Sequence, residues 1–208
     1  LFRRQRQMCI RDRNWNGDMT INSPSPLIYS NWVKTFKKML LEDDVSLNHS
    51  FTNTVGPLFL EKVLRNFENA GAWCDIKHSN KIETCAELSE KSLTRSLSKL
   101  TDVYGPDVNT WRWGNERRIN HRSFSVDGIL IPKFLHEISS EISGSKHTLN
   151  STMLSEVSKS NEAKASSFKM IIDFSSERKN MFILPTGQSG HMISKHYDDL
   201  TNIWKDGN

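Results

Sequence analysis

Residues 185–198, near the end of the chain, hold serine, histidine and aspartate side chains of the kinds that act as nucleophiles, bases and metal ligands. The segment Gly187-Gln188-Ser189-Gly190 resembles a nucleophile elbow, in which a serine lies on a sharp turn between a strand and a helix. That motif is G-x-S-x-G, however, and here the second glycine comes one residue early, with His191 in its place. We therefore expect Ser189 to have no catalytic role.

The histidines of this stretch could instead bind a metal ion together with the neighbouring aspartates. The spacing of His191 and His196 is not that of the H-E-x-x-H motif, and His136-Glu137 has Ser140 where a second histidine would be required. Histidines that cap turns and make hydrogen bonds are the simpler interpretation. The sequence thus predicts no metal site and no cofactor in this chain.

The elements on either side of this stretch are expected to position it. An apolar run at residues 181–184 indicates a buried strand, and Gly187 and Gly190 would allow positive φ values and a tight turn after it. Ser194 stands where a helix N-cap belongs, because Tyr197 and later apolar residues follow at helical spacing. We expect the turn to seat a C-terminal helix against the strand, with Gly190 the glycine more sensitive to a β-branched substitution.

The pattern GQSGH-x-x-S-x-HYDD, followed by an Ile-Trp pair, resembles the C-terminal signature of the penicillin acylase family. Further upstream, Trp111-Arg112-Trp113-Gly114 is similar to the family's Trp-x-Trp-Gly, and His121 matches a family histidine. Two positions depart from the family pattern. Arg117 stands where the family has an earlier histidine, and Lys169 stands where it has arginine, which keeps the charge but loses a bidentate fork.

Members of this family are amide hydrolases whose nucleophile is a serine freed as the first residue of a β-subunit by self-cleavage of a precursor, with its own amino group as base. That serine, the oxyanion donors and the calcium ligands of some members lie upstream of the part that residues 14–208 resemble. The resemblance therefore places no catalytic residue and no metal ligand in this chain. It implies structural roles for the motif residues, which are Trp113, Gly114, His121, Gly187, Gln188, Ser189, Gly190, Ser194, His196 and Tyr197.

The resemblance also implies that the chain is a fragment, most of the last third of such a β-subunit. Its fold would be α+β, contributing helices and outer strands to the αββα core of N-terminal-nucleophile hydrolases. The parent, a periplasmic or secreted protein made as a zymogen, would hydrolyse a linear acyl amide such as a β-lactam side chain or an N-acyl homoserine lactone. Its partners would be the missing upstream β-subunit segment and the α-subunit of the same precursor.

Two functions of other classes remain as alternatives to this interpretation. One is a non-catalytic structural or binding module, in which the six tryptophans pack or contact a ligand. The other is an independent serine hydrolase that uses Ser189.

Composition and charge argue against two classes of partner. The 208 residues contain no apolar run of the roughly 20 residues that a membrane span needs. The net charge of +4 comes entirely from residues 1–13, which hold five arginines and one aspartate, so the remainder is neutral and offers no basic surface for nucleic acid. Residues 1–13 have no hydrophobic period and are similar to translated sequencing-adapter sequence, and we expect them to be non-native and disordered.

Residues 14–105 are predicted to be mainly helical and residues 106–208 to be mixed. Helices are expected to begin at Ser25-Pro26, with Ser25 as N-cap, at Gly56-Pro57, and at Thr84, which forms a capping box with Glu87. The side chains predicted to face inward are Ile28, Trp32, Phe36 and Leu40 in the first helix, Leu60, Val63, Leu64 and Phe67 in the second, and Ala86, Leu93, Leu97 and Leu100 in the third.

The second half is predicted to hold strands at residues 110–126 and 167–174, the second pairing with residues 181–184 in a hairpin. A short helix is expected from Pro132 to Gly144, and a mobile loop over residues 151–165. The strand at 167–174 places Phe168, Met170, Ile172 and Phe174 on one face.

Cys74 and Cys85 lie eleven positions apart across a polar loop, with no histidine or cysteine at zinc spacing. In a secreted or periplasmic protein such a pair suggests a disulfide that closes a small loop. Two unrelated thiols remain the alternative from sequence.

Overall fold

The computed structural model describes residues 14–42, 55–122, 132, 136–154, 163–175 and 180–206. The predicted non-native, disordered start at residues 1–13 lies outside them. The described chain divides into two compact units, the first made of residues 14–16 and 24–111 and the second of residues 17–23 and 112–206. No helix in these described ranges combines the length and the apolarity needed to cross a membrane.

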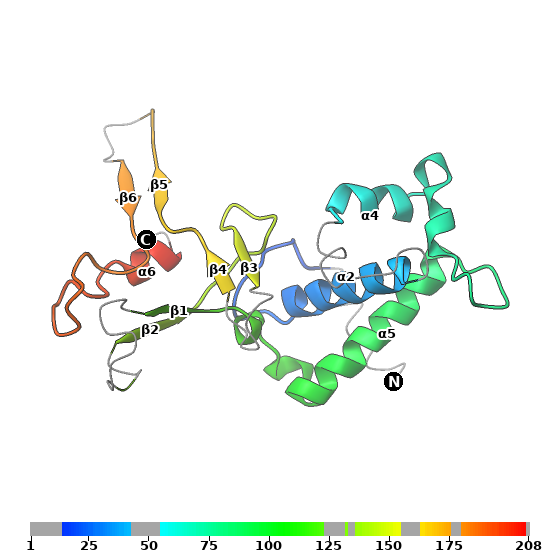
Figure 1. Cartoon of the computed structure of the whole chain (residues 1–208), viewed down its shortest axis with the longest axis horizontal. Helices are drawn as coiled ribbons and strands as arrows, with labels where there is room; N and C mark the ends of the chain where they lie inside the picture. Colours follow the sequence, from blue (N-terminus) through cyan, green and yellow to red (C-terminus); the bar gives the residue numbers. More distant parts are fainter. Residues whose placement is uncertain are drawn as a thin grey trace. The chain divides into compact units, whose positions relative to one another are not determined.

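The first unit is helical (Figure 1), as predicted. Its elements are α2 (Ser25–Leu41), α4 (Pro57–Leu64), a 3-10 helix (Phe67–Cys74) and α5 (Cys85–Tyr104). The capping box at the start of α5 is present, since Glu87 N–H donates to Thr84 Oγ1 and Thr84 N–H donates to Glu87. Gly105 ends the helix with φ 83°, in the left-handed region that favours glycine. The predicted cap of α2 is off by one residue, because Pro24 is the N-cap and no side chain caps the helix.

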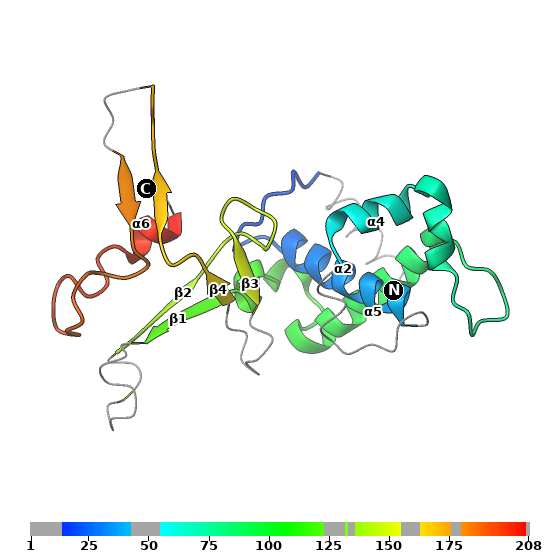
Figure 2. The ribbon, with the colours of Figure 1, turned by 45° about the horizontal axis from the view of Figure 1, so that its top comes forward.

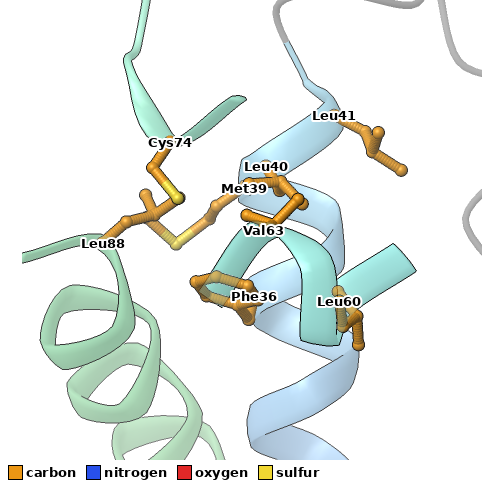
Figure 3. Packing of buried hydrophobic residues seen from close by; sticks show 8 residues of the cluster. All are labelled: Phe36, Met39, Leu40, Leu41, Leu60, Val63, Cys74 and Leu88. Atoms are coloured by element: carbon orange, nitrogen blue, oxygen red, sulfur yellow. The ribbon is translucent and has the colours of Figure 1, made fainter. Parts of the chain in front are cut away.

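The core of this unit lies where α2, α4 and α5 meet (Figure 3). Cys74 and Leu88 lie on one side of the cluster. Eight buried side chains form it: Phe36, Met39, Leu40, Leu41, Leu60, Val63, Cys74 and Leu88.

The buried line of α5 is not the one predicted from its leucines. It runs through Leu88, Ser92, Ser96 and Leu100, whereas Ala86 is exposed and Leu93 and Leu97 are half-buried. Ser92 can be buried because its hydroxyl donates to the Ser89 carbonyl and accepts from the Trp32 indole N–H, at 3.0 Å. A pattern built on apolar residues alone therefore misplaces this face.

The second predicted helix also ends earlier than expected, which leaves two of its predicted core residues outside the core. Leu64 and Phe67 are exposed, and the helix stops at Leu64. Asn66 and Glu68 take positive φ values (53° and 54°), which no α-helix tolerates.

The second unit contains three two-stranded antiparallel sheets among the described residues, and a short final helix. The pairs are β1 (Arg118–Arg122) with β2 (Glu137–Glu141), β3 (Thr152–Leu154) with β4 (Ala163–Ala165), and β5 (Lys169–Ile171) with β6 (Met181–Ile183). Helix α6 spans Thr201–Asp206. The mixture of helices and small antiparallel sheets is α+β, and the predicted hairpin of β5 and β6 is confirmed. The prediction that residues 181–184 form a buried strand is wrong, because Met181 and Phe182 are exposed and only Ile183 of β6 is buried.

Three predictions of secondary structure in this part of the chain are corrected. The strand predicted over residues 110–126 is confined to β1 within the described residues, because Trp113–Glu116 forms a 3-10 helix. Residues 137–141 form the strand β2, where a helix was predicted. The prediction was ambiguous because Ile138 and Ile142 are four residues apart, a spacing that places side chains on one face of a strand as well as of a helix. Pairing with β1 then decides the structure, with His121 opposite Ile138. The loop predicted over residues 151–165 is ordered at both ends as β3 and β4, and its middle lies outside the described residues.

Candidate functional site

The stretch with the densest chemical side chains forms a closed loop between β6 and α6. Gly187 N–H donates to the Tyr197 carbonyl at 2.8 Å, and Ser189 N–H donates to the His196 carbonyl at 3.0 Å. The two arms of the loop are thus joined through their backbones. Figure 1 shows this loop in orange and red, running from the end of β6 back to α6.

Gly187 is required by a close approach and not by an unusual dihedral angle. A Cβ atom at this position would lie 1.8 Å from the His196 carbonyl oxygen, too close for any side chain, while around Gly190 there is open space. Neither glycine is in the left-handed region. The predicted positive φ values are therefore wrong, and so is the expectation that Gly190 is the more sensitive of the two.

Ser194 makes a turn and does not cap the final helix. Its hydroxyl accepts a hydrogen bond from His196 N–H at 3.2 Å, and its carbonyl accepts one from Tyr197 N–H at 3.1 Å. A serine that bonds the amide two residues later forms a side-chain turn. Successive turns follow, and α6 begins only at Thr201, so the predicted N-cap is wrong.

The hydroxyl of Ser189 has a local partner, because it accepts a hydrogen bond from His191 N–H at 3.1 Å. Within the part of the chain that the structure describes, no hydrogen bond joins this hydroxyl to a histidine ring. His196 is instead bonded through Nδ1 to Asp199 Oδ2 at 2.7 Å, on the surface. A serine nucleophile needs a base within hydrogen-bond reach, and this loop gives Ser189 none. Gln188, the neighbour of Ser189 in the motif, is exposed.

Helix α6 anchors the loop through Trp204, which is fully buried. The ammonium of Lys169 lies 4.6 Å from the centre of the Trp204 ring and donates to the Trp204 carbonyl. The His121 ring meets Trp204 edge-on, with 5.8 Å between ring centres. Tyr197 adds a further anchor, since its hydroxyl donates to the His136 carbonyl.

Burial shifts the protonation equilibria of these groups. It lowers the pKa of His121, which favours the neutral ring. It also lowers the pKa of Lys169, an effect that the Asp206 carboxylate partly opposes. Sequence reasoning identified both residues but missed that they contact one tryptophan. The signal for Lys169 was a lone cation in an otherwise apolar strand.

The Trp-x-Trp-Gly segment forms a second cluster in the same unit. Trp113 is fully buried, its indole N–H donates to the Gly144 carbonyl at 3.0 Å, and its backbone N–H donates to the Ser23 carbonyl at 3.0 Å. Gly114 N–H donates to the Ile21 carbonyl, and a Cβ on this glycine would lie 2.6 Å from Glu141 Oε2. These contacts pin residues 17–23 to the second unit.

Arg117, which stands at the departure from the family pattern, is buried on the Trp113 ring. Its guanidinium carbon lies 4.3 Å from the ring centre, and Nη1 donates to the Thr152 carbonyl at 3.4 Å. Burial lowers the pKa of Arg117 to about 10, which leaves it charged at neutral pH. Arg117 therefore has a packing role here. The histidine of the family pattern, when neutral, would not make the same cation–π contact with the Trp113 ring.

Of the motif residues named from sequence, Trp113 and Gly114 form one cluster and His121 lies at Trp204, while those from 187 to 197 lie in the closed loop that precedes α6. No group of three or more histidine, cysteine, aspartate or glutamate side chains in the described ranges could hold a metal ion. In the first unit a disulfide joins Cys74 to Cys85. Of the two interpretations that the sequence left open, the disulfide is therefore the one found, and not two unrelated thiols.

The comparisons with known proteins agree on one family. A sequence model of the family described as penicillin amidase matches residues 3–208. The chain is 29% identical over 136 residues to an acyl-homoserine lactone acylase QuiP of Pseudomonas syringae pv. tomato, an alignment that covers 65% of this chain and 16% of that protein. An acylase of the same name from Pseudomonas fluorescens is 26% identical over 140 residues, which cover 67% of this chain and 16% of that protein. The chain therefore matches about one sixth of the length of these relatives.

Proposed function

The chain belongs to the penicillin amidase family, and on that premise we propose that residues 14–208 are a non-catalytic, structural part of a longer acylase. The parent hydrolyses a linear acyl amide, releasing a carboxylic acid from an amine. Relatives named as acyl-homoserine lactone acylases support an N-acyl homoserine lactone as substrate, with a β-lactam side chain as the second candidate.

The observation that carries this proposal is the bonding of Ser189, whose hydroxyl accepts a hydrogen bond from the His191 amide and, among the residues that the structure describes, is bonded to no base. The loop of residues 187–197 braces α6 against the hairpin of β5 and β6, and the nucleophilic serine belongs to the upstream part of the parent. The fold of residues 14–208 is then a piece of the αββα architecture. The disulfide supports a periplasmic or secreted location, where thiols are oxidised.

One experiment separates a structural from a catalytic role for the loop. In the complete parent, Ser189→Ala should leave self-cleavage and turnover of N-acyl homoserine lactone per folded molecule within about twofold of the unmodified enzyme, whereas replacement of the upstream N-terminal serine should abolish both. The purified 208-residue chain should hydrolyse neither this substrate nor a chromogenic acyl anilide. Hydrolysis by the isolated chain that is lost with Ser189→Ala would overturn the proposal.

A further inference from the structure

The hairpin of β5 and β6 carries apolar side chains on both of its faces. The pairing places Lys169 opposite Ile183 on one face, and this end of the face packs on α6, since Ile183 is buried and Lys169 contacts Trp204. The next pair on the same face, Ile171 and Met181, is exposed. Met170 and Phe182 are opposite each other on the other face. Figures 1 and 2 both show the hairpin extending away from α6 beyond its base.

The second face is exposed although it is apolar. Phe182, Met170 and Phe168 expose 63%, 57% and 49% of their surface. Phe168 and Phe182 stack on each other with 5.2 Å between ring centres, so the three side chains form one continuous patch, which we call the outer face. No charged side chain is among them.

An antiparallel hairpin with one face in water normally alternates apolar and polar residues, whereas strands that are covered on both faces are apolar throughout. This hairpin is close to the second pattern, since all of its paired residues except Lys169 are apolar. A two-stranded ribbon is also only marginally stable by itself, and three or more strands or a covering element are needed. The outer face therefore has the composition of a buried surface, although it is exposed in this structure.

We propose that the outer face is the docking surface for an apolar, uncharged segment of the parent acylase that lies outside these 208 residues. This inference rests on the proposed function, that the chain is part of a longer enzyme. The relatives support this occupant over a second copy of the chain. The aligned region is only 16% of the length of each relative, so a parent of similar length would contain many further residues that could cover the outer face. The absence of charge on the patch excludes a polyanion or an acidic peptide as the occupant.

Photocrosslinking in the complete parent tests the proposal directly. Benzoylphenylalanine in place of Phe182 should crosslink to a peptide from outside residues 1–208, identified by mass spectrometry. The matched control is the same replacement of Leu149, an exposed apolar residue of the same unit that is not on the hairpin, and it should give at least tenfold less of that product. Crosslinks from position 182 only within residues 1–208, or only to a second parent molecule, would overturn the proposal.

A stability measurement gives a second and independent readout. Phe182→Ser should lower the unfolding midpoint of the isolated 208-residue chain by only a few degrees, because the mostly exposed side chain loses its stacking on Phe168 there, and should lower that of the parent by about twice as much or more. Leu149→Ser should change neither. Equal losses in chain and parent, or no loss in either, would contradict the docking surface. Neither readout uses hydrolysis, so a parent that fails to cleave acyl amides would refute the proposed function and leave this test intact.

Discussion

Gly187 shows how a residue can be indispensable for a reason unrelated to its own dihedral angles. It is held against the His196 carbonyl, with its N–H bonded to Tyr197, so that the missing Cβ is what lets the two arms of the loop meet. Gly190, two residues past Gln188 in the same motif, has open space around it. The motif therefore contains one glycine with a steric requirement and one without.

Gly187→Ala should lower the free energy of unfolding by about 1–3 kcal/mol, because the methyl group must push a backbone carbonyl away and break the pairing of the loop. Gly190→Ala is the matched control and should stay within about 0.5 kcal/mol of the unmodified chain. Urea denaturation of both variants measures the difference. Equal effects at the two positions would show that the loop closes in another way.

His121 should make the chain less stable in mild acid. Burial lowers its pKa in the folded state, so the unfolded state binds the proton more readily. Its neutral ring supports folding fully above the unfolded pKa of about 6.5, and that support is lost progressively as pH falls below it.

His121→Phe keeps an aromatic edge toward Trp204 and should remove this part of the acid destabilisation, while the exposed His78→Asn should not. Thermal unfolding between pH 7.5 and pH 5 measures how steeply the unfolding midpoint of each variant falls with pH. An unchanged slope in His121→Phe would assign the pH dependence to other groups.

At the scale of the elements, the disulfide joins the 3-10 helix at Cys74 to the first residue of α5, beside the main core of the first unit. The same helix start carries the capping box of Thr84 and Glu87, and the Thr84 amide together with Lys81 lowers the pKa of Glu87 to about 2. The N-terminus of α5 is therefore fixed by a covalent bond and by local hydrogen bonds at the same point.

The double variant Cys74→Ala, Cys85→Ala should lose about 3 kcal/mol of stability, the chain-entropy value for a loop of this length. Reduction of the unmodified chain by dithiothreitol should give the same loss and should not affect the double variant. Peptide mapping of material made in an oxidising compartment checks the bond itself. Two alkylatable thiols at these positions would remove the basis of the prediction.

Elements defined by local signals were predictable from the sequence, and elements defined by distant pairing were not. The capping box of α5, its closing glycine and the hairpin of β5 and β6 each follow from neighbouring residues. Strand β2 was mistaken for a helix because its isoleucine spacing fits both periods and its partner β1 is distant. The burial of Ser92 in α5 does not follow from a hydrophobic pattern, because its hydroxyl is satisfied by the Ser89 carbonyl and the Trp32 indole, which such a pattern does not record.

The same distinction applies to the candidate site. The motif identified Trp113, Tyr197 and Gly187, but the contact of Lys169 with Trp204 joins residues 35 positions apart. The closeness of Gly187 to His196 likewise depends on how the loop folds back.

At the scale of the whole molecule, the excess of positive charge comes from one end of the sequence. Residues 1–13 carry the entire net charge of +4, and the other residues sum to zero. Electrostatic attraction to a polyanion grows with the number of basic side chains that can reach it. Any such attraction should therefore come from this segment alone.

Deletion of residues 1–13 should abolish retention of the chain on heparin at low salt, where the intact chain is retained through its five clustered arginines. Elution by a salt gradient measures the effect, and the circular dichroism spectrum checks that the fold is intact. Retention that survives the deletion would reveal a basic surface in the body of the chain that the charge count misses.

Residues 17–23 belong to the second unit although the chain on both sides of them belongs to the first. Several of the bonds that attach them join a backbone amide to a backbone carbonyl, such as Gly144 N–H to the Met19 carbonyl at 2.8 Å, and do not depend on side-chain identity. Asn22 is an exception, because its side-chain oxygen accepts a hydrogen bond from Arg112. When genes of related acylases recombine, a crossover between positions 23 and 112 would give these seven residues and their binding partners different ancestry. Such chimeras should fold with most substitutions in this segment but not with an insertion or a deletion. A change of length would shift the backbone carbonyls away from the amides that they accept hydrogen bonds from.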